Sequence, residues 1–375
     1  MSLFIIHLKK DFFRYLIFTF LILFAIHPSY SKILLKPYLQ VPSNNGVCVM
    51  VESDSKEPVT VQFGSNTSYG KEASSSAFLE TGAEPASFVH RIFINGLPPN
   101  SVCHYRSIQG SDTTSDSYFK TCGMPGEPLK FAVMGDCRSG KDLHARIAKG
   151  ILKNEPLFSI YTGDLCFDRS YEKWKSEFFL PEELELSSRV PFCNSPGNHE
   201  GWTNNTKAFT QAPQSSSGSQ EYYSFDIGDV HFIIISTENK CCKDCPQYKF
   251  IEEDLKASKK PWKIAAFHES AYCYGGHGNN NMMKKVSENL FEKYGVQLVV
   301  TGHSHFYQHN LVAGIHHLTL AGGGAPLYSP KSSEYTVKSA KEHHYAICDV
   351  TSNTLKITVF NIDGKILDEI ELKKK

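Results

Sequence analysis

The sequence predicts an α/β fold preceded by a small all-β sandwich, and three observations support this prediction. Residues 33 to 122 contain short alternating or β-branched segments, such as "PVTVQFG" and "FVHRIFINGL", separated by Pro, Gly, Asn and Ser. From residue 129 onward, short continuous apolar runs appear instead, and each is followed by a polar cluster. Helical patterns lie between some of these runs, which is typical of an α/β domain.

The N-terminal region is expected to be a compact β-sandwich, because its length and its frequent turn residues suit that architecture. A Gly- and Pro-containing stretch, "TCGMPGEPLK" (Thr121–Lys130), marks the predicted boundary. We therefore expect three parts: a signal peptide over residues 1–31, the sandwich over 32–125 and a larger domain over 126–375.

The apolar runs of the larger domain predict its strands. They are "LKFAVMGD", "LFSIYTGD", "VPFCNSPGNHE", "WKIAAFHE" and "VQLVVTGHSH". Runs this continuous are typical of strands whose sheet is covered by helices on both faces. Helices are expected at "KDLHARIAKGILKN" and "NMMKKVSENLFEKYG", and an antiparallel hairpin at "YYSFDIGDVHFIIIST".

The first 31 residues resemble an export signal. Lys9, Lys10 and Arg14 precede an apolar run from Tyr15 to Ile26, and small residues suited to cleavage follow. The run is short for a bilayer span, which needs about 20 residues. We expect a secreted or periplasmic protein that is not held in the membrane after cleavage. The balance of 39 basic and 39 acidic residues argues against a nucleic-acid partner, and the oligomeric state is not legible.

Export permits disulfides among the 11 cysteines. Cys103 and Cys122 bracket a predicted hairpin and would face each other if the turn centred on Asp112–Thr113. The cluster "KCCKDC" at residues 240–245 has zinc-like spacing but no second pair nearby, which favours a disulfide-braced loop over a zinc site.

Polar side chains follow each apolar run of the larger domain. They are Asp136, Asp164, Asn198 with His199, His268, His303 and His305. Side chains just past the carboxyl ends of strands converge on one crevice in an open α/β sheet. Glycines precede four of these positions, which allows sharp turns and close backbone approach.

Oxygen and nitrogen ligands gathered in this way predict a binuclear metal site. Two ions need a bridging carboxylate, with His, Asn and Asp filling the remaining positions. The two histidines of "VVTGHSH" are then expected to hold one ion each. The alternative is that each Asp after Gly is only a helix cap or turn residue. Five such elements in order favour the metal site.

The blocks "GDCR", "GDLCF", "GNHE", "AAFH" and "GHSH" resemble the signature blocks of calcineurin-like metallophosphoesterases, and of purple acid phosphatases in particular. "KPYLQV" and "HRIFINGLPPNSVCHYR" resemble that family's N-terminal fibronectin-like sandwich. The resemblance implies a β-sandwich core flanked by helices, in four layers (α/β/β/α), preceded by a fibronectin III-like domain.

The resemblance also implies the roles of the site residues. Metal one is bound by Asp136, Asp164 and His305, and metal two by Asp164, Asn198, His268 and His303, with Asp164 bridging. His199 matches a histidine that contacts phosphate and protonates the leaving group. Glu200 is hypothesised to orient His199, and His277 resembles an additional substrate-side histidine, with a plain surface histidine as the alternative.

Two departures from the family pattern affect metal one. Phe167 stands where purple enzymes have the tyrosine that ligates Fe(III). Arg138 stands where other metallophosphoesterases have a histidine, and it is interpreted either as a phosphate contact or as a structural partner of a site carboxylate. A colourless enzyme using labile divalent ions (Mn, Fe(II), Zn or Mg) is therefore expected. Cys137 and Cys166 are expected to pack in the core behind the site.

The function expected from the resemblance is hydrolysis of phosphate monoesters by a metal-activated hydroxide. Diester cleavage on the same metal core is the near alternative. A catalytically degenerate binding or adhesion protein is a third possibility, disfavoured because every metal-two ligand is present. Substrate choice is expected to depend on loops such as Trp202–Ser219 and Cys241–Gln247.

Overall fold

The computed structural model describes residues 31–374 of the chain. The predicted signal peptide lies outside these described residues, apart from Ser31. Within residues 31–374, no helix is both long and apolar enough to cross a membrane.

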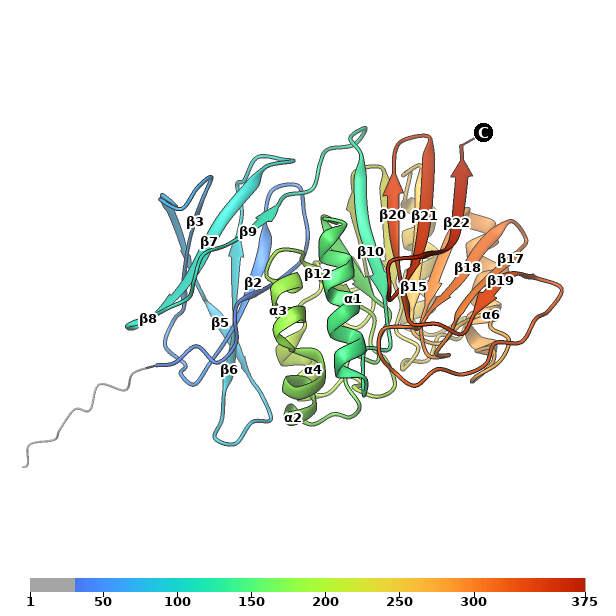
Figure 1. The fold of residues 1–375 in the computed structure, drawn as a ribbon. Helices are drawn as coiled ribbons and strands as arrows, with labels where there is room; N and C mark the ends of the chain where they lie inside the picture. Colours follow the sequence, from blue (N-terminus) through green and yellow to red (C-terminus); the bar gives the residue numbers. More distant parts are fainter. Residues whose placement is uncertain (1–30, 375) are drawn as a thin grey trace, which may run out of the picture. The chain divides into compact units, whose positions relative to one another are not determined.

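A ten-stranded mixed sheet runs through the structure (Figure 1). Its strands, in spatial order, are β22 (Ile366–Lys373), β21 (Thr354–Asn361), β20 (His344–Val350), β10 (Leu129–Met134), β11 (Phe158–Tyr161), β12 (Phe192–Asn194), β1 (Tyr38–Gln40), β2 (Val47–Ser53), β6 (Phe88–Ile94) and β5 (Ala77–Glu80). The strands β10, β11 and β12 are parallel, so their carboxyl ends lie at one edge of the sheet.

A second sheet has seven strands. In spatial order they are β13 (Tyr223–Ile227), β14 (Val230–Ile234), β15 (Trp262–Phe267), β16 (Leu298–Thr301), β18 (Ile315–Leu320), β17 (Tyr307–Val312) and β19 (Thr336–Ala340). The hairpin predicted at "YYSFDIGDVHFIIIST" is confirmed as the antiparallel pair β13–β14. The strands β14, β15, β16 and β18 are parallel neighbours.

The two sheets pack face to face over one hydrophobic core. Phe131 and Val133 of β10 share this core with Ile264 of β15 and Val300 of β16. Because side chains alternate along a strand, neighbouring residues of the same strands point the other way, toward helices. The prediction that helices cover both faces of one sheet is therefore wrong in one respect, since the inner face of each sheet packs against the other sheet.

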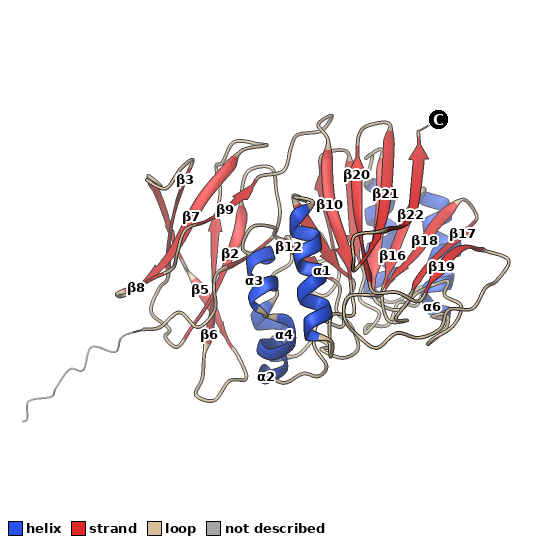
Figure 2. Ribbon diagram, viewed as in Figure 1, coloured by secondary structure: helices blue, strands red, loops and turns tan. Residues whose placement is uncertain are grey.

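Helices cover the two outer faces, giving the expected α/β/β/α layers (Figure 2). The helical elements are α1 (Lys141–Lys153), α2 (Tyr171–Lys173), the π-helical turn η1 (Trp174–Phe178), α3 (Pro181–Ser187), α4 (Asn204–Phe209), α5 (Pro246–Ala257), α6 (Asn281–Val286), the π-helical turn η2 (Ser287–Phe291) and α7 (Glu292–Tyr294). Ile147 and Ile151 of α1 lie in the same hydrophobic cluster as Met134 of β10. Met283 of α6 packs in the cluster that contains Phe267 of β15.

The N-terminal region is all-β, as predicted. A further sheet has the order β4 (Lys71–Ser74), β3 (Thr60–Gly64), β7 (Val102–Gln109) and β8 (Asp112–Thr113), and β9 (Ser117–Lys120) also pairs with β7. Its apolar side chains share a core with those of β2 and β6. The region continues into the larger sheet through the parallel pair β1–β12. Its fibronectin-like character and the domain bounds stay predictions.

The predicted Cys103–Cys122 disulfide is wrong. In the β7–β9 pair Cys103 lies opposite Phe119, and Cys103 and Cys122 are free thiols in different hydrophobic clusters. The braced-loop interpretation of "KCCKDC" is confirmed, because Cys242 and Cys245 form a disulfide.

Candidate metal centre

The ends of five strands, drawn from both sheets, carry the predicted ligands. Asp136, Asp164 and Asn198 follow β10, β11 and β12, whereas His268 follows β15, and His303 and His305 follow β16. The prediction that these ends meet is confirmed, with the difference that two packed sheets contribute rather than one open sheet. We call these six residues the candidate metal centre.

Sharp turns bring the ligands inward. Asp136, Asp164 and His303 have positive φ values of 59°, 54° and 69°, which non-glycine residues seldom adopt. Gly197 is required by close packing, because a Cβ there would lie 2.3 Å from the backbone nitrogen of Asp164. The backbone N–H of Asp136 donates to the Gly163 carbonyl at 2.9 Å, which ties two of the turns together.

Asp164 lies at the middle of the centre and is 1% exposed. Its Oδ1 lies 3.3 Å from Nε2 of His268 and accepts a hydrogen bond of 3.1 Å from the backbone N–H of His199. Its Oδ2 accepts a hydrogen bond of 3.2 Å from Nε of Arg138. A carboxylate whose two oxygens face different neighbours suits a bridging role.

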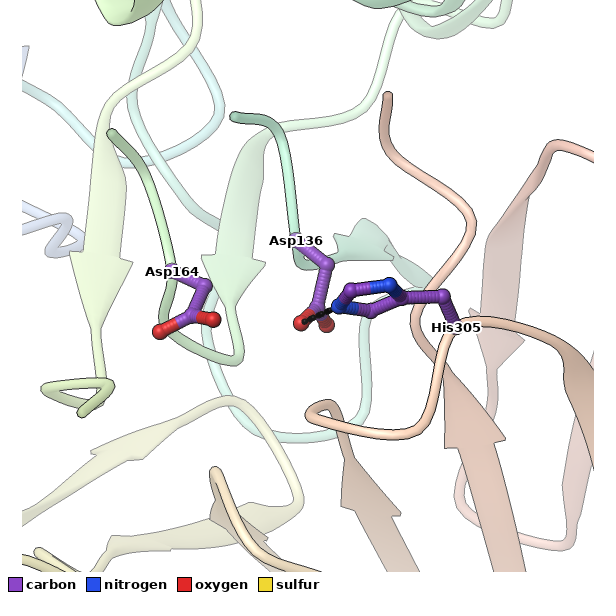
Figure 3. A group of neighbouring side chains, drawn as sticks. All are labelled: Asp136, Asp164 and His305. Atoms are coloured by element: carbon purple, nitrogen blue, oxygen red, sulfur yellow. Dashed lines mark ion pairs between the residues drawn. The ribbon is translucent and has the colours of Figure 1, made fainter. Parts of the chain in front are cut away.

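One half of the centre joins Asp136, Asp164 and His305, whose candidate ligand atoms all lie within 4.8 Å of one another. Figure 3 shows these three side chains converging, and the dashed line marks the 3.3 Å separation between Oδ1 of Asp136 and Nε2 of His305. Asp136 is fully buried, and its carboxylate also accepts hydrogen bonds from the backbone N–H of His303.

The other half joins His268 to Asn198, His303 and Asp164. Nε2 of His268 lies 3.0 Å from Oδ1 of Asn198 and 3.2 Å from Nδ1 of His303. Burial, together with the neighbouring His268, lowers the pKa of His303 to about 3, so His303 is neutral at pH 7. Burial also opposes the charged form of His268, but the carboxylates, Asp164 first, raise its pKa to about 9.

The donor set fits a pair of divalent ions. Ligands that sit about 2.0–2.2 Å from a metal lie roughly 3.0–3.5 Å from one another, which matches the separations around His268 and His305. Nδ1–H of His268 donates to the Thr162 carbonyl at 2.7 Å, and Nδ1–H of His305 donates to the Pro326 carbonyl at 2.8 Å. Because these bonds engage Nδ1, Nε2 is the nitrogen of each ring that would ligate a metal, and backbone carbonyls orient ligating histidines in this way in known metal sites.

His199 lies beside the centre with one nitrogen already engaged. Its Nδ1–H donates to the Phe167 carbonyl, and its Nε2 lies 3.8 Å from Oδ2 of Asp164. The hypothesis that Glu200 orients His199 is wrong. Glu200 is fully buried and accepts a 2.9 Å hydrogen bond from the backbone N–H of Gly197, so it supports the turn before Asn198 instead. Burial, with a contribution from Asp164, raises the pKa of Glu200 to about 8.

Arg138 and His277 also reach the centre. Arg138 donates to Asp164, and its Nη2 lies 3.4 Å from Nε2 of His305, so the structural pairing considered for it is present. The His277 ring stacks on His303 with centroids 4.1 Å apart. His277 is therefore at the mouth of the centre rather than elsewhere on the surface. Cys137 and Cys166 are buried in the helix-side core, as predicted.

Sequence reasoning missed one residue that shapes the site. Glu177, in η1, accepts hydrogen bonds from the backbone N–H of Ser139 at 3.1 Å and of Phe167 at 2.9 Å. It thereby joins the loop after β10 to the loop after β11. No motif marks Glu177, because it lies in a helical segment far from any strand end.

Known proteins share this architecture. Residues 129–307 match the family model for the calcineurin-like phosphoesterase. The chain therefore carries a calcineurin-like phosphoesterase domain, a family whose fold implies divalent metal ions. It resembles the "Probable inactive purple acid phosphatase 1" of Arabidopsis thaliana, with 24% identity over 84% of this chain and 62% of that protein.

Two further similarities extend over most of the chain. "Acid phosphatase type 7" of Danio rerio is 24% identical, with 88% of each chain covered. The structure of purple acid phosphatase PPD1 from yellow lupin (Lupinus luteus) superposes with a TM-score of 0.77 at 19% identity, covering 90% of this chain and 74% of that one. The fold is thus that of a purple acid phosphatase. The chain spans about three-fifths or less of the length of several Arabidopsis relatives, for example 58% of purple acid phosphatase 23 and 49% of purple acid phosphatase 15.

Proposed function

We propose that this protein hydrolyses phosphate monoesters with two divalent metal ions held in the candidate metal centre. The observation that carries the proposal is the convergence of one aspartate, one asparagine and three histidines around Asp164, from strand ends up to 169 residues apart in sequence (Asp136 to His305). The similarity to a protein named acid phosphatase type 7 favours monoesters over diesters.

Asp136, Asp164 and His305 would hold one ion, and Asp164, Asn198, His268 and His303 the other. The ions, when bound, supply positive charge that polarises the phosphoryl group and makes an activated water available near neutral pH. Their identity is open among Fe, Mn, Zn and Mg. Phe167 has no ligand atom to offer, so a tyrosinate-bound Fe(III) is not part of the proposal.

The remaining side chains act on the substrate. His199 is fixed by the bond from Nδ1–H to the Phe167 carbonyl, so Nε2 faces the centre. When protonated there, it can deliver that proton to the departing alcohol oxygen. Arg138 and His277 would contact the phosphate, Arg138 through the guanidinium nitrogens not used by Asp164. Glu177 keeps both loops in position.

The test is hydrolysis of p-nitrophenyl phosphate and of its bis-ester, with added Mn²⁺ or Zn²⁺ and with EDTA, alongside the metal content of the purified protein. We expect monoester turnover that EDTA abolishes, about two metal ions per chain, and loss of turnover in Asn198→Ala. Preference for the bis-ester would make the protein a diesterase, and activity on neither ester would favour a degenerate binding protein.

We also propose that the protein is exported and that its mature chain has two domains. Cleavage after Ser31 would release a protein with a sandwich over residues 32–125 and a phosphoesterase domain over 126–375. Detection of the protein outside the producing cell, with an N-terminal sequence beginning at Lys32, is the expected result. A protein retained inside the cell with Met1 intact would contradict it.

A further inference from the structure

The Phe167 side chain is unusually open for an aromatic residue at a buried site. It is 47% exposed, although it lies three residues after the buried Asp164. Exposed apolar surface forfeits about 25 cal/mol per Å² relative to burial, so folding alone gives no reason to leave this ring uncovered.

The loop that carries Phe167 is nevertheless fixed. Its backbone N–H donates to the buried carboxylate of Glu177 at 2.9 Å, and its carbonyl accepts from Nδ1–H of His199. The exposed ring therefore occupies a defined place at the rim of the candidate metal centre, and no reordering of the loop is needed before a ligand meets it.

The neighbours of the ring define which part of a substrate it meets. The His199 ring lies 5.5 Å away, centroid to centroid, at an angle of 45°. The guanidinium carbon of Arg138 lies 5.8 Å from the ring centroid, and Nζ of Lys173 lies 5.6 Å from it. The ring thus neighbours both Arg138, whose guanidinium can hold a phosphate group, and His199, the histidine that faces the leaving group.

We propose that Phe167 forms the apolar wall of a leaving-group subsite, and that the preferred substrates are phosphate esters of aromatic alcohols. The inference rests on the proposed phosphoesterase function. Aromatic rings interact favourably in offset or edge-to-face arrangements at centroid distances of 4.5–7 Å, a gain that a small aliphatic group does not share. An aromatic leaving group beside His199 lies within that reach of Phe167.

The experiment compares kcat/KM for phenyl phosphate and methyl phosphate in the metal-loaded protein. Phe167→Ala should lower the value for phenyl phosphate about two- to tenfold more than the value for methyl phosphate. The phenyl-to-methyl ratio of kcat/KM in the variant is divided by the same ratio in the wild type, so the difference in intrinsic reactivity between the two leaving groups cancels. Phe167→Leu, which keeps apolar bulk and folds more safely, should change the ratio in the same direction by less.

A matched control is Phe93→Ala in β6, which removes a phenylalanine of 49% exposure on the N-terminal strands and should leave the ratio unchanged. An equal loss for both esters in Phe167→Ala would overturn the inference. If the wild-type protein hydrolyses neither ester, the proposed function fails, and calorimetry with phenylphosphonate and methylphosphonate then tests the wall alone. The inference is supported if the wild-type protein binds phenylphosphonate more tightly than methylphosphonate and Phe167→Ala abolishes this difference. Equal binding of the two phosphonates by the wild-type protein overturns it.

Discussion

The Glu177 carboxylate accepts a hydrogen bond of 2.9 Å from the backbone N–H of Phe167. The same oxygen accepts one of 3.1 Å from Ser139, and the other oxygen accepts from Nζ of Lys173 at 2.9 Å. Glu177 is 4% exposed, so these partners replace water almost completely. A side chain outside the candidate metal centre thus joins the two loops that carry Asp136 and Asp164.

Glu177→Ala is expected to reduce both stability and activity. The two backbone donors would lose their acceptor at partly buried positions, which costs about 1–3 kcal/mol of unfolding free energy. Urea unfolding and kcat/KM measure the two effects, and Glu177→Gln, which keeps one oxygen, should restore part of each. Glu172→Ala on α2 is the control, because Glu172 is exposed. If Glu177→Ala has the activity of the wild type, Glu177 does not position the two loops for catalysis.

Arg138→Ala is expected to weaken inhibition by inorganic phosphate. A charge-assisted hydrogen bond contributes about 1.5–3 kcal/mol, so the inhibition constant should rise at least about tenfold at saturating metal. Arg138→Lys should lie between wild type and Arg138→Ala. Arg146→Ala, which breaks an exposed pair with Asp363, is the control. An unchanged inhibition constant would leave Arg138 only its pairing with Asp164.

The purified protein is expected to lack a visible absorption band, because Phe167 has no phenolate to bind Fe(III). Phe167→Tyr loaded with Fe(III) should acquire such a band, and Phe93→Tyr, treated in the same way, should not. The spectrum of the as-isolated protein is the first measurement. A band in the wild type would mean that another side chain ligates iron.

The convergence of the six residues of the candidate metal centre was predictable because each one lies within four residues after the end of an apolar strand. Asp136 and Asp164 come after continuous apolar runs, and side chains that follow the carboxyl ends of neighbouring strands lie close together in space. Glu177 was not predictable, because a carboxylate in a helical segment is ordinarily solvated and only the packing of two loops buries this one. The role expected for Glu200 was wrong for a similar reason, because the position of Glu200 next to His199 in sequence does not determine where its side chain points.

The Cys103–Cys122 error has a geometric cause. The disulfide required a hairpin turning at Asp112–Thr113, but these two residues form β8, and the chain returns to β7 again in β9. This second return places Phe119, rather than Cys122, opposite Cys103. Turn composition located the chain reversal approximately, but predicting the pairing register requires the exact turn, because each residue of error shifts every partner.

The apolar runs alone did not predict that the two sheets pack against each other, because a strand covered by a sheet and a strand covered by a helix are equally apolar.

The hydrogen bonds of His231, which involve no residue of the candidate metal centre, predict how the stability of the protein depends on pH. Nδ1–H of His231 on β14 donates to Asp226 on β13 at 2.8 Å, and Nε2–H donates to Asp254 on α5 at 2.8 Å. An imidazole that donates from both nitrogens carries both protons and is positively charged. Burial lowers the pKa of His231, but its hydrogen bonds to the two carboxylates outweigh that effect and raise the pKa to about 9.

The folded-state pKa therefore lies above the ordinary value of about 6.5. The stabilisation is fully present below about pH 6.5 and is lost as the pH rises through 9, because only the folded protein holds the proton in that range. Asp226 is half-exposed, which reduces the effect to about 1–3 kcal/mol. Urea unfolding of wild type and His231→Gln at pH 6 and pH 10, in EDTA so that metal loss does not contribute, should show a stability difference that shrinks by that amount at the higher pH.

His104→Gln is the control, because His104 pairs with Asp116 in the N-terminal region with both side chains partly exposed, so its substitution should change stability little at either pH. If the difference between wild type and His231→Gln is the same at pH 6 and pH 10, His231 is neutral in the folded protein. One of its two hydrogen bonds is then absent, and the hairpin β13–β14 is attached to α5 by packing, with Tyr222 against Phe250, rather than by charge.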